Sequence, residues 1–312
     1  MAARGRRRAV LAAIVAVVVV ASAGAALFAT GDGSAPLDAD AVPDPPGAAG
    51  AQQTTATTPR TPWPTPEPFP NPDMQVLSES DNQTVSTYKL APGTVNETEV
   101  YVVESSEPGP TALVVGGMHG NEVSGFTAAH NIANWTIERG TLVVIPEANK
   151  AAVTTRTRKA FGTDLNDEFP VGGVSNSTLA NAIWTAVEYH DPDVVIDLHS
   201  SKGIYKVDEG GVGQAIFPGA TGTAREDTAA AINYLNENEV PDEMQEHKFK
   251  RGNILKGSGK SLTRRVVGDL GASAILIETA KRDTTLDQRV RWTEVAVRVI
   301  LSRHGMVAAP GT

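Results

Sequence analysis

The chain has 312 residues, of which 41% are hydrophobic and 20% charged, and its formal net charge is −9. This length and apolar content allow one large domain with a buried core, and the negative charge argues against nucleic-acid binding through phosphate contacts. There is no cysteine, which excludes disulfides, thiolate metal sites and a cysteine nucleophile, so any metal must be held by His, Asp or Glu. An acidic composition also fits a salt-adapted organism.

The first part of the chain has the pattern of a membrane-targeting segment. Four arginines lie within residues 1–8, and residues 9–29 contain no charged residue. About 20 apolar residues can cross a bilayer as a helix, and the preceding arginines favour an exported remainder. We predict that residues 1–29 are a signal or membrane anchor. An uncleaved anchor is favoured, because the apolar core of a signal peptide is only about 7–15 residues long.

A Pro- and Thr-rich segment follows, at residues 30–74. It holds too few apolar residues to fold and is predicted to be a disordered linker. Residues 75–312 then form the folded domain, extracellular and membrane-anchored, or secreted if the leader is cleaved. Acceptor tripeptides for N-glycosylation, which fit export, begin at Asn82, Asn96, Asn134 and Asn176.

Apolar runs alternate with helical patterns through the rest of the chain. The predicted strands lie at residues 99–103, 112–116, 142–145, 194–198, 215–217 and 274–277. The predicted helices lie at about 121–135, 178–190, 223–238, 260–270 and 285–304. Continuous aliphatic strands are expected where both faces of a sheet are covered. The alternation predicts an α/β fold, with a mixed, largely parallel sheet flanked by helices on both faces.

Polar side chains stand where three of these strands end, and ligand sites collect at the carboxyl ends of strands in such sheets. His119 and Glu122 follow one strand, His199 follows another, and Glu278 ends a third. Each alone has a structural explanation, such as a polar turn or a favourable carboxylate in a first helical turn. Together, two His and one Glu match a catalytic zinc site that leaves a fourth position open for water. We predict one Zn²⁺ held by His119, Glu122 and His199.

Glu278 is the candidate general base of this site. Zinc would lower the pKa of bound water to about 7 and polarise the scissile carbonyl, and a nearby carboxylate would accept the water proton and pass it to the leaving nitrogen. Glu278 follows four apolar residues, where desolvation raises the pKa of a carboxyl group. The alternative is an ion pair with Lys281 or Arg282.

Four segments in order carry a family resemblance. These are Gly116–Glu122, Asp164–Asn166, Asp197–Ser200 and Ile277–Glu278. Over about residues 95–302 the chain resembles the zinc carboxypeptidase superfamily, most of all its succinylglutamate desuccinylase and aspartoacylase branch. The resemblance implies the same three zinc ligands and the same glutamate as base and proton shuttle.

The resemblance also implies substrate-binding residues. An arginine ahead of the Asp-Leu-Asn segment would polarise the substrate carbonyl and stabilise the oxyanion. Arg156 and Arg158 are both candidates, and Arg158 is preferred because it lies eight residues before Asn166. Asn166 would line the substrate pocket.

One position departs from the family pattern, which continues Asp-Leu-Asn-Arg-x-Phe with an arginine that grips a substrate carboxylate. Here Asp167 replaces that arginine, and Glu168 follows it. A carboxylate substrate would lose a bidentate partner and meet like charge. We therefore expect a neutral or cationic substrate group at this position.

The sequence as a whole predicts a membrane-tethered zinc hydrolase that cleaves an amide bond in a small molecule or peptide, in the manner of a deacylase. His199 follows Glu122 by 77 residues, a compact arrangement that favours the deacylase branch over the first alternative, a metallocarboxypeptidase acting on peptides. A second alternative is a non-catalytic surface module that binds zinc structurally. Structural zinc sites usually have four protein ligands, which favours an enzyme.

Overall fold

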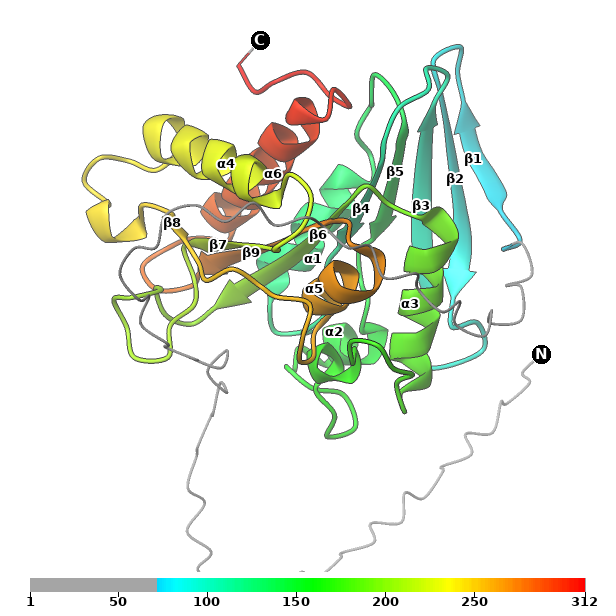
Figure 1. The fold of residues 1–312 in the computed structure, drawn as a ribbon, viewed down its shortest axis with the longest axis horizontal. Helices are drawn as coiled ribbons and strands as arrows, with labels where there is room; N and C mark the ends of the chain where they lie inside the picture. The colour runs from blue at the N-terminus through cyan, green and yellow to red at the C-terminus, as the bar shows by residue number, and fades with distance from the viewer. Residues whose placement is uncertain (1–71, 312) are drawn as a thin grey trace, which may run out of the picture. The chain divides into compact units, whose positions relative to one another are not determined.

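The computed structural model describes residues 72–311, drawn in colour in Figure 1. The predicted anchor, residues 1–29, and residues 30–71 of the predicted linker lie outside the described residues. In the described part, no helix is both long and apolar enough to cross a membrane.

Within residues 72–311, nine strands form one sheet in the order β1-β2-β3-β5-β4-β6-β9-β7-β8. The strands are β1 (Gln75–Glu79), β2 (Gln83–Leu90), β3 (Thr98–Ser105), β4 (Thr111–Val115), β5 (Thr141–Ile145), β6 (Val194–Ser201), β7 (Ala215–Pro218), β8 (Lys250–Arg251) and β9 (Ser273–Ala280). All six predicted strands are present, and β1, β2 and β8 are additional.

The sheet is mixed, as predicted, but it is not largely parallel, and that part of the prediction was wrong. Strands β5, β4, β6 and β9 run parallel in its centre. Strands β1, β2, β3 and β5 pair antiparallel on one side, and β7 pairs antiparallel with β9 on the other. Strands β1, β2 and β3 follow one another through short turns, and antiparallel neighbours need no crossover helix.

Helices cover both faces of the sheet, as predicted (Figure 1). The helices are α1 (Val123–Ile132), α2 (Lys150–Thr155), α3 (Thr178–His190), α4 (Ala224–Asn238), α5 (Leu262–Arg265) and α6 (Leu286–Arg303). Short 3-10 turns lie at η1 (Leu165–Glu168) and η2 (Gln245–His247), and η3 (Val266–Leu270) is a π-helical turn that continues α5. Helix α3 has the predicted bounds, whereas α2 was not predicted.

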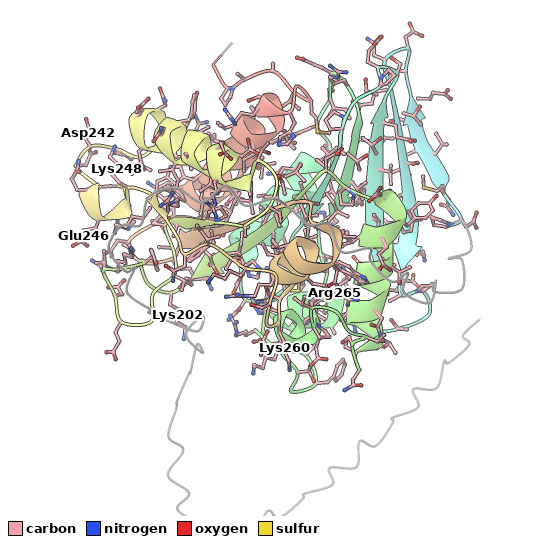
Figure 2. All side chains as sticks on the ribbon, viewed as in Figure 1. Lys202, Asp242, Glu246, Lys248, Lys260 and Arg265 are labelled. Atoms are coloured by element: carbon pink, nitrogen blue, oxygen red, sulfur yellow. The ribbon has the colours of Figure 1, made fainter. Side chains whose placement is uncertain are left out.

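Alternate residues of each central strand enter two separate cores. In β4, Ala112 and Val114 pack in the core under α1, α4 and α6, whereas Leu113 and Val115 pack in the core under α3 and α5. Arg265, labelled in Figure 2, joins α5 to α3, because its guanidinium carbon lies 4.0 Å from the centre of the Trp184 ring. This two-sided burial fixes the strand ends from which the polar residues project.

Candidate metal centre

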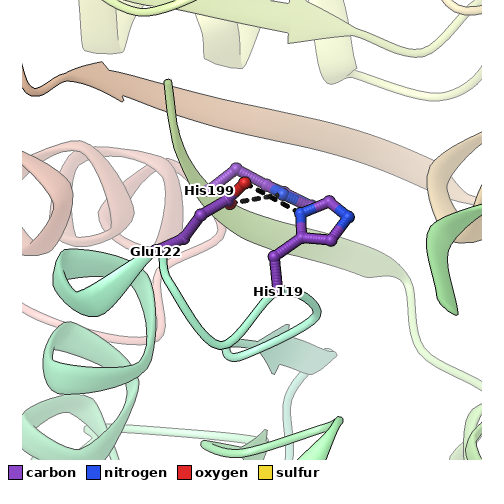
Figure 3. Close-up of side chains that lie close together, drawn as sticks. All are labelled: His119, Glu122 and His199. Atoms are coloured by element: carbon purple, nitrogen blue, oxygen red, sulfur yellow. Dashed lines mark hydrogen bonds and ion pairs between the residues drawn. The ribbon is translucent and has the colours of Figure 1, made fainter. Parts of the chain in front are cut away.

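Parallel pairing of β4 with β6 brings two strand exits together. Val115 lies beside Asp197 in the register of these strands, so the loop that follows β4 meets the end of β6. His119 and Glu122 come from that loop and His199 from β6 (Figure 3). One ligand atom from each lies within 4.8 Å of the others, and all three side chains are buried.

Each histidine presents one ring nitrogen to Glu122 and the other to an aspartate. His119 Nδ1 lies 2.8 Å from Glu122 Oε1, and its Nε2 lies 2.9 Å from Asp164 Oδ1. His199 Nδ1 lies 2.9 Å from Glu122 Oε2, and its Nε2 lies 3.1 Å from Asp197 Oδ2. The two Nδ1 atoms therefore both face the Glu122 carboxylate, one at each of its oxygens.

The charges of these groups are coupled. Burial by itself would raise the pKa of Glu122, but the two histidines outweigh it and hold that pKa well below its usual range. Burial by itself would lower the pKa of His119, and the carboxylates of Glu122 and Asp164 raise it instead. The site therefore holds an ionised carboxylate between two imidazoles.

This donor set fits a divalent metal such as zinc. Imidazole nitrogen and carboxylate oxygen are the ligands that zinc takes in three-ligand catalytic sites. Two buried atoms beside the cluster, Glu278 Oε2 and Asn166 Oδ1, have no hydrogen-bond partner within residues 72–311. Polar atoms that are buried without partners are rare in folded proteins, so these two are available to a substrate or water.

Glu278 lies next to the cluster because β9 pairs parallel with β6, with Glu278 beside His199. Its side chain is buried. Desolvation, followed by the charge of Glu122, raises the pKa of Glu278 to about 8, against the opposing charges of the histidines and Arg158. A carboxyl group with a pKa near neutrality suits proton transfer.

The predicted alternative for Glu278, an ion pair with its neighbours on the chain, is not formed. Lys281 Nζ instead donates to the backbone carbonyl of Asn121, at 2.9 Å, in the loop that carries the ligands. Arg282 pairs with Asp208, Glu246 and Asp283. Among the residues that the structure describes, the Glu278 carboxyl therefore has no ion-pair partner, and its Oε2 has no hydrogen-bond partner.

The structure separates the two candidate arginines. Arg158 Nη1 lies 3.2 Å from Glu122 Oε1, and its Nε lies 3.0 Å from Asp164 Oδ2. Arg156 ends α2 in a left-handed conformation, with its guanidinium carbon 4.8 Å from the centre of the Phe126 ring. Arg158, the residue preferred from sequence, is the one that contacts the cluster.

The Asp-Leu-Asn segment forms the turn η1 beside the cluster. The Asp164 carboxylate accepts a hydrogen bond from the backbone N–H of Asn166 at 3.3 Å. Asp167, in the position of the family arginine, is exposed. Glu168 accepts a hydrogen bond from the Ser175 hydroxyl at 3.3 Å. The acidic pair thus offers one exposed carboxylate and one that is already bonded.

Asp164 contacts His119 and Asp197 contacts His199, and neither aspartate was predicted from the sequence to be part of the site. One signal was readable for Asp197. It lies two residues before His199 in one strand, and residues two apart in a strand share a face. Asp164 could not be paired with His119 from sequence, because 45 residues separate them.

The remaining four histidines lie apart from the cluster. His130 faces Glu147, His247 faces the carbonyl of Arg282, and His304 faces Asp227. Burial lowers the pKa of His190 to about 4, and its Nε2 lies 3.0 Å from the hydroxyl of Tyr88.

Comparison with known proteins places this site in a family. Residues 108–302, more than half of the chain, match the succinylglutamate desuccinylase/aspartoacylase catalytic domain. An N-alpha-acetyl-L-2,4-diaminobutyric acid deacetylase from Halomonas elongata is 37% identical over 109 residues, which cover 32% of this chain and 31% of that protein.

Solved structures show the same fold. The mDAP-bound form of Csd4 from Helicobacter pylori, described as a D,L-carboxypeptidase, is 20% identical with a TM-score of 0.55, over 64% of this chain and 51% of that one. The product-bound ectoine utilization protein EutE (DoeB) from Ruegeria pomeroyi is 18% identical with a TM-score of 0.54, over 78% of this chain and 74% of that one. The chain thus spans about half of Csd4 and less of the Halomonas deacetylase. By the extent of the family match, it belongs to the succinylglutamate desuccinylase/aspartoacylase family.

Proposed function

We propose that the chain is a zinc-dependent hydrolase that cleaves an amide bond, in the manner of a deacylase. Family membership supports a hydrolase, and the convergence of His119, Glu122 and His199 supports a metal site with an open position. The observation that carries the proposal is Glu278. It is a buried carboxyl group without an ion-pair partner in the described region, and it stands beside His199.

Each residue of the site has a separate role in the proposed reaction. Zinc, when bound, supplies a Lewis acid that activates water and polarises the substrate carbonyl. Glu278 takes the proton of the attacking water and delivers it to the leaving nitrogen. Arg158, held at its Nε by Asp164, stabilises the negative charge that develops on the carbonyl oxygen. Asn166 offers its buried side-chain oxygen to the substrate.

Replacing the proposed base tests the mechanism. Glu278→Gln keeps the shape of the side chain but cannot accept the proton, so turnover is expected to fall by about 10²–10⁴-fold. Its zinc content, measured by metal analysis, is expected to equal that of the unchanged protein. If the variant turned over a true substrate as fast as the unchanged protein, this mechanism would be contradicted. A chain without turnover on any amide would favour the non-catalytic module.

We further propose that the substrate carries a neutral or cationic group at the exposed carboxylate of Asp167. An aspartate attracts an ammonium group and repels a carboxylate. The name of the Halomonas relative points the same way, because diaminobutyric acid carries a second amine. N-acylated amino acids with basic side chains are therefore the first substrates to try, with zinc present.

A charge reversal tests this substrate class. Asp167→Arg is expected to change the ratio of kcat/KM for N-acetyl-diaminobutyrate to that for N-acetylaspartate by about 10-fold in favour of the acidic compound. Glu79→Arg, on the exposed strand β1, makes the same charge change elsewhere and is the control. If acidic substrates were cleaved best by the unchanged protein and Asp167→Arg did no better on them, the proposal would fail.

The same panel separates the two enzyme classes. The metallocarboxypeptidase alternative draws on the fold shared with Csd4. Short peptides with free C-termini belong beside the N-acyl amino acids in the screen. Release of C-terminal residues in preference to acyl groups would favour this alternative.

We also propose that the enzyme acts outside the cytoplasm, held by residues 1–29. The proposal rests on the basic and apolar pattern of those residues. N-terminal sequencing of the mature protein distinguishes an anchor from a cleaved leader. A protein that keeps its N-terminus and fractionates with the cytoplasm would contradict export.

A further inference from the structure

Asp197 is an aspartate in the middle of the sheet. It lies on β6, between Val115 of β4 on one side and Leu276 of β9 on the other. Its exposed fraction is 0%, so no part of the carboxylate reaches solvent. Residues 195 and 198 of the same strand belong to the two apolar cores. A hydrophobic residue would suit this position in a fold of this kind.

The fold provides few polar partners for this buried carboxylate. Neither oxygen accepts a hydrogen bond within residues 72–311, and His199 Nε2, which lies 3.1 Å from Oδ2, makes no hydrogen bond there either. This close contact of charge with the ring is the only ion pair of Asp197 among the described residues. Other buried acidic side chains have more hydrogen-bond partners. Asp227 has contacts with three side chains, and Glu122 accepts from the backbone N–H of Ser200. Burying a carboxylate with so few partners costs free energy.

The contact matters for the ring of His199. A neutral imidazole carries its proton on one nitrogen and a lone pair on the other. In this structure the hydrogen bond of the ring is the one between Nδ1 and Glu122. When zinc takes the lone pair of Nδ1, the charge of a carboxylate beside Nε2 would hold the remaining proton on Nε2. His199 Nδ1 is the atom that lies 2.9 Å from Glu122, at the point where the three ligands converge.

We propose that Asp197 is a positioning residue: it fixes the ring orientation and tautomer of His199 and thereby sets the affinity of the site for Zn²⁺. This inference rests on the proposed zinc site. The contact of Asp164 with His119 is similar at 2.9 Å, but Asp164 also binds Arg158. Within the described residues, Asp197 has His199 alone, so its replacement isolates the effect.

The test is a zinc titration of the metal-free full chain. Asp197→Asn keeps the size of the side chain and an oxygen facing Nε2 but removes the charge, and its Kd for Zn²⁺ is expected to rise about 10–100-fold. The thermal midpoint of the metal-free variant is expected to equal or exceed that of the unchanged protein, because the buried charge is removed. Asp193→Asn is the matched control. Asp193 precedes the same strand, is exposed, and binds the backbone N–H of Thr111 at 2.8 Å, so its replacement is expected to leave the Kd unchanged.

A second measurement needs no variant of Asp197. Nitrogen-15 NMR of the zinc-loaded chain, with the His199 signals identified from a His199→Asn sample, reports which ring nitrogen carries the proton. A proton on Nε2 is expected, and a proton on Nδ1 overturns the inference.

Two further outcomes contradict it. An unchanged zinc Kd in Asp197→Asn would show that the contact does not act on the metal. A fall in zinc affinity matched by an equal loss of metal-free stability would show a structural role. Failure of the unchanged protein to bind zinc is a different result, because it removes the proposed function itself.

Discussion

At the scale of single residues, Gly120 determines how closely the ligand loop approaches α2. A Cβ atom at this position would lie 1.8 Å from the backbone oxygen of Ala152 and 2.0 Å from its carbonyl carbon. Real side chains never come so near to backbone atoms, so the loop between His119 and Glu122 would have to move. A glycine is required here because any side chain would clash with the backbone of Ala152.

Gly120→Ala is therefore expected to disrupt the site. Overpacking against backbone costs about 3 kcal/mol or more, and zinc affinity is expected to drop at least about 10-fold as the two ligands shift. Gly173→Ala is the control, because its Cβ would meet only Pro170 side-chain carbons at 3.7 Å. Urea unfolding and zinc titration of both variants provide the check. Equal behaviour of the two alanine variants would contradict this account of the loop.

At the scale of elements, a buried carboxylate ties α4 to the end of α6. Asp227 Oδ1 lies 2.7 Å from Arg303 Nε, and Oδ2 lies 3.0 Å from His304 Nε2. The Thr223 hydroxyl also donates to Oδ2, at 2.6 Å. Burial alone would raise the pKa of Asp227, but the hydrogen bonds from His304, Thr223 and Arg303 outweigh it and lower the pKa below 3.8.

Asp227→Asn is expected to lower the free energy of unfolding by about 2–3 kcal/mol at neutral pH, since it leaves buried partners unpaired while Arg303 is partly solvated. A depressed pKa stabilises the fold above the unfolded value of about 3.9, and this contribution is lost as the pH falls through the folded pKa. The gap between the two proteins should therefore narrow from neutral pH toward about pH 3.

Urea unfolding across that range measures the gap. Asp242→Asn is the control. Its side chain is 98% exposed and pairs with Lys248 at 3.2 Å (Figure 2), so it is expected to cost less than about 1 kcal/mol. A gap for Asp227→Asn that widened on acidification would contradict the lowered pKa.

The elements that the sequence missed share a physical cause. Strand β1 is exposed at every residue, so no hydrophobic pattern marks it, and it forms by pairing with β2. Helix α2 has six residues, held at its start by the Asn149 side chain, and is too short to show a helical period. Helix α3, by contrast, is long and amphipathic, and its start is marked by the Ser177 cap.

At the scale of the whole molecule, the metal is expected to stabilise the fold. A ligand that binds only the native state adds about 4.1 kcal/mol at a thousand times its Kd. For a domain of this size each kcal/mol is worth about 2–4 °C. Removal of zinc by a chelator is thus expected to lower the thermal midpoint by about 10 °C.

Calorimetry with and without chelator tests this expectation, and a His119→Ala variant is the control. The variant lacks a ligand, so its midpoint should not respond to chelator. A protein shown to carry zinc whose midpoint was unmoved by the chelator would contradict the link between metal and fold. An equal response in the variant would place the stabilising metal elsewhere.

The sequence by itself determined the family, the alternation of strands and helices, and which polar residues stand at strand exits. These properties are local, because periodicity and a change from apolar to polar residues are visible along a short stretch of chain. The tertiary structure decided the antiparallel strands beside the parallel centre, the choice of Arg158 over Arg156, and the contacts of Asp164 and Asp197. Most of these depend on groups far apart in the chain, such as Arg158 and Glu122, which are 36 residues apart. Only packing of the sheet brings such groups together.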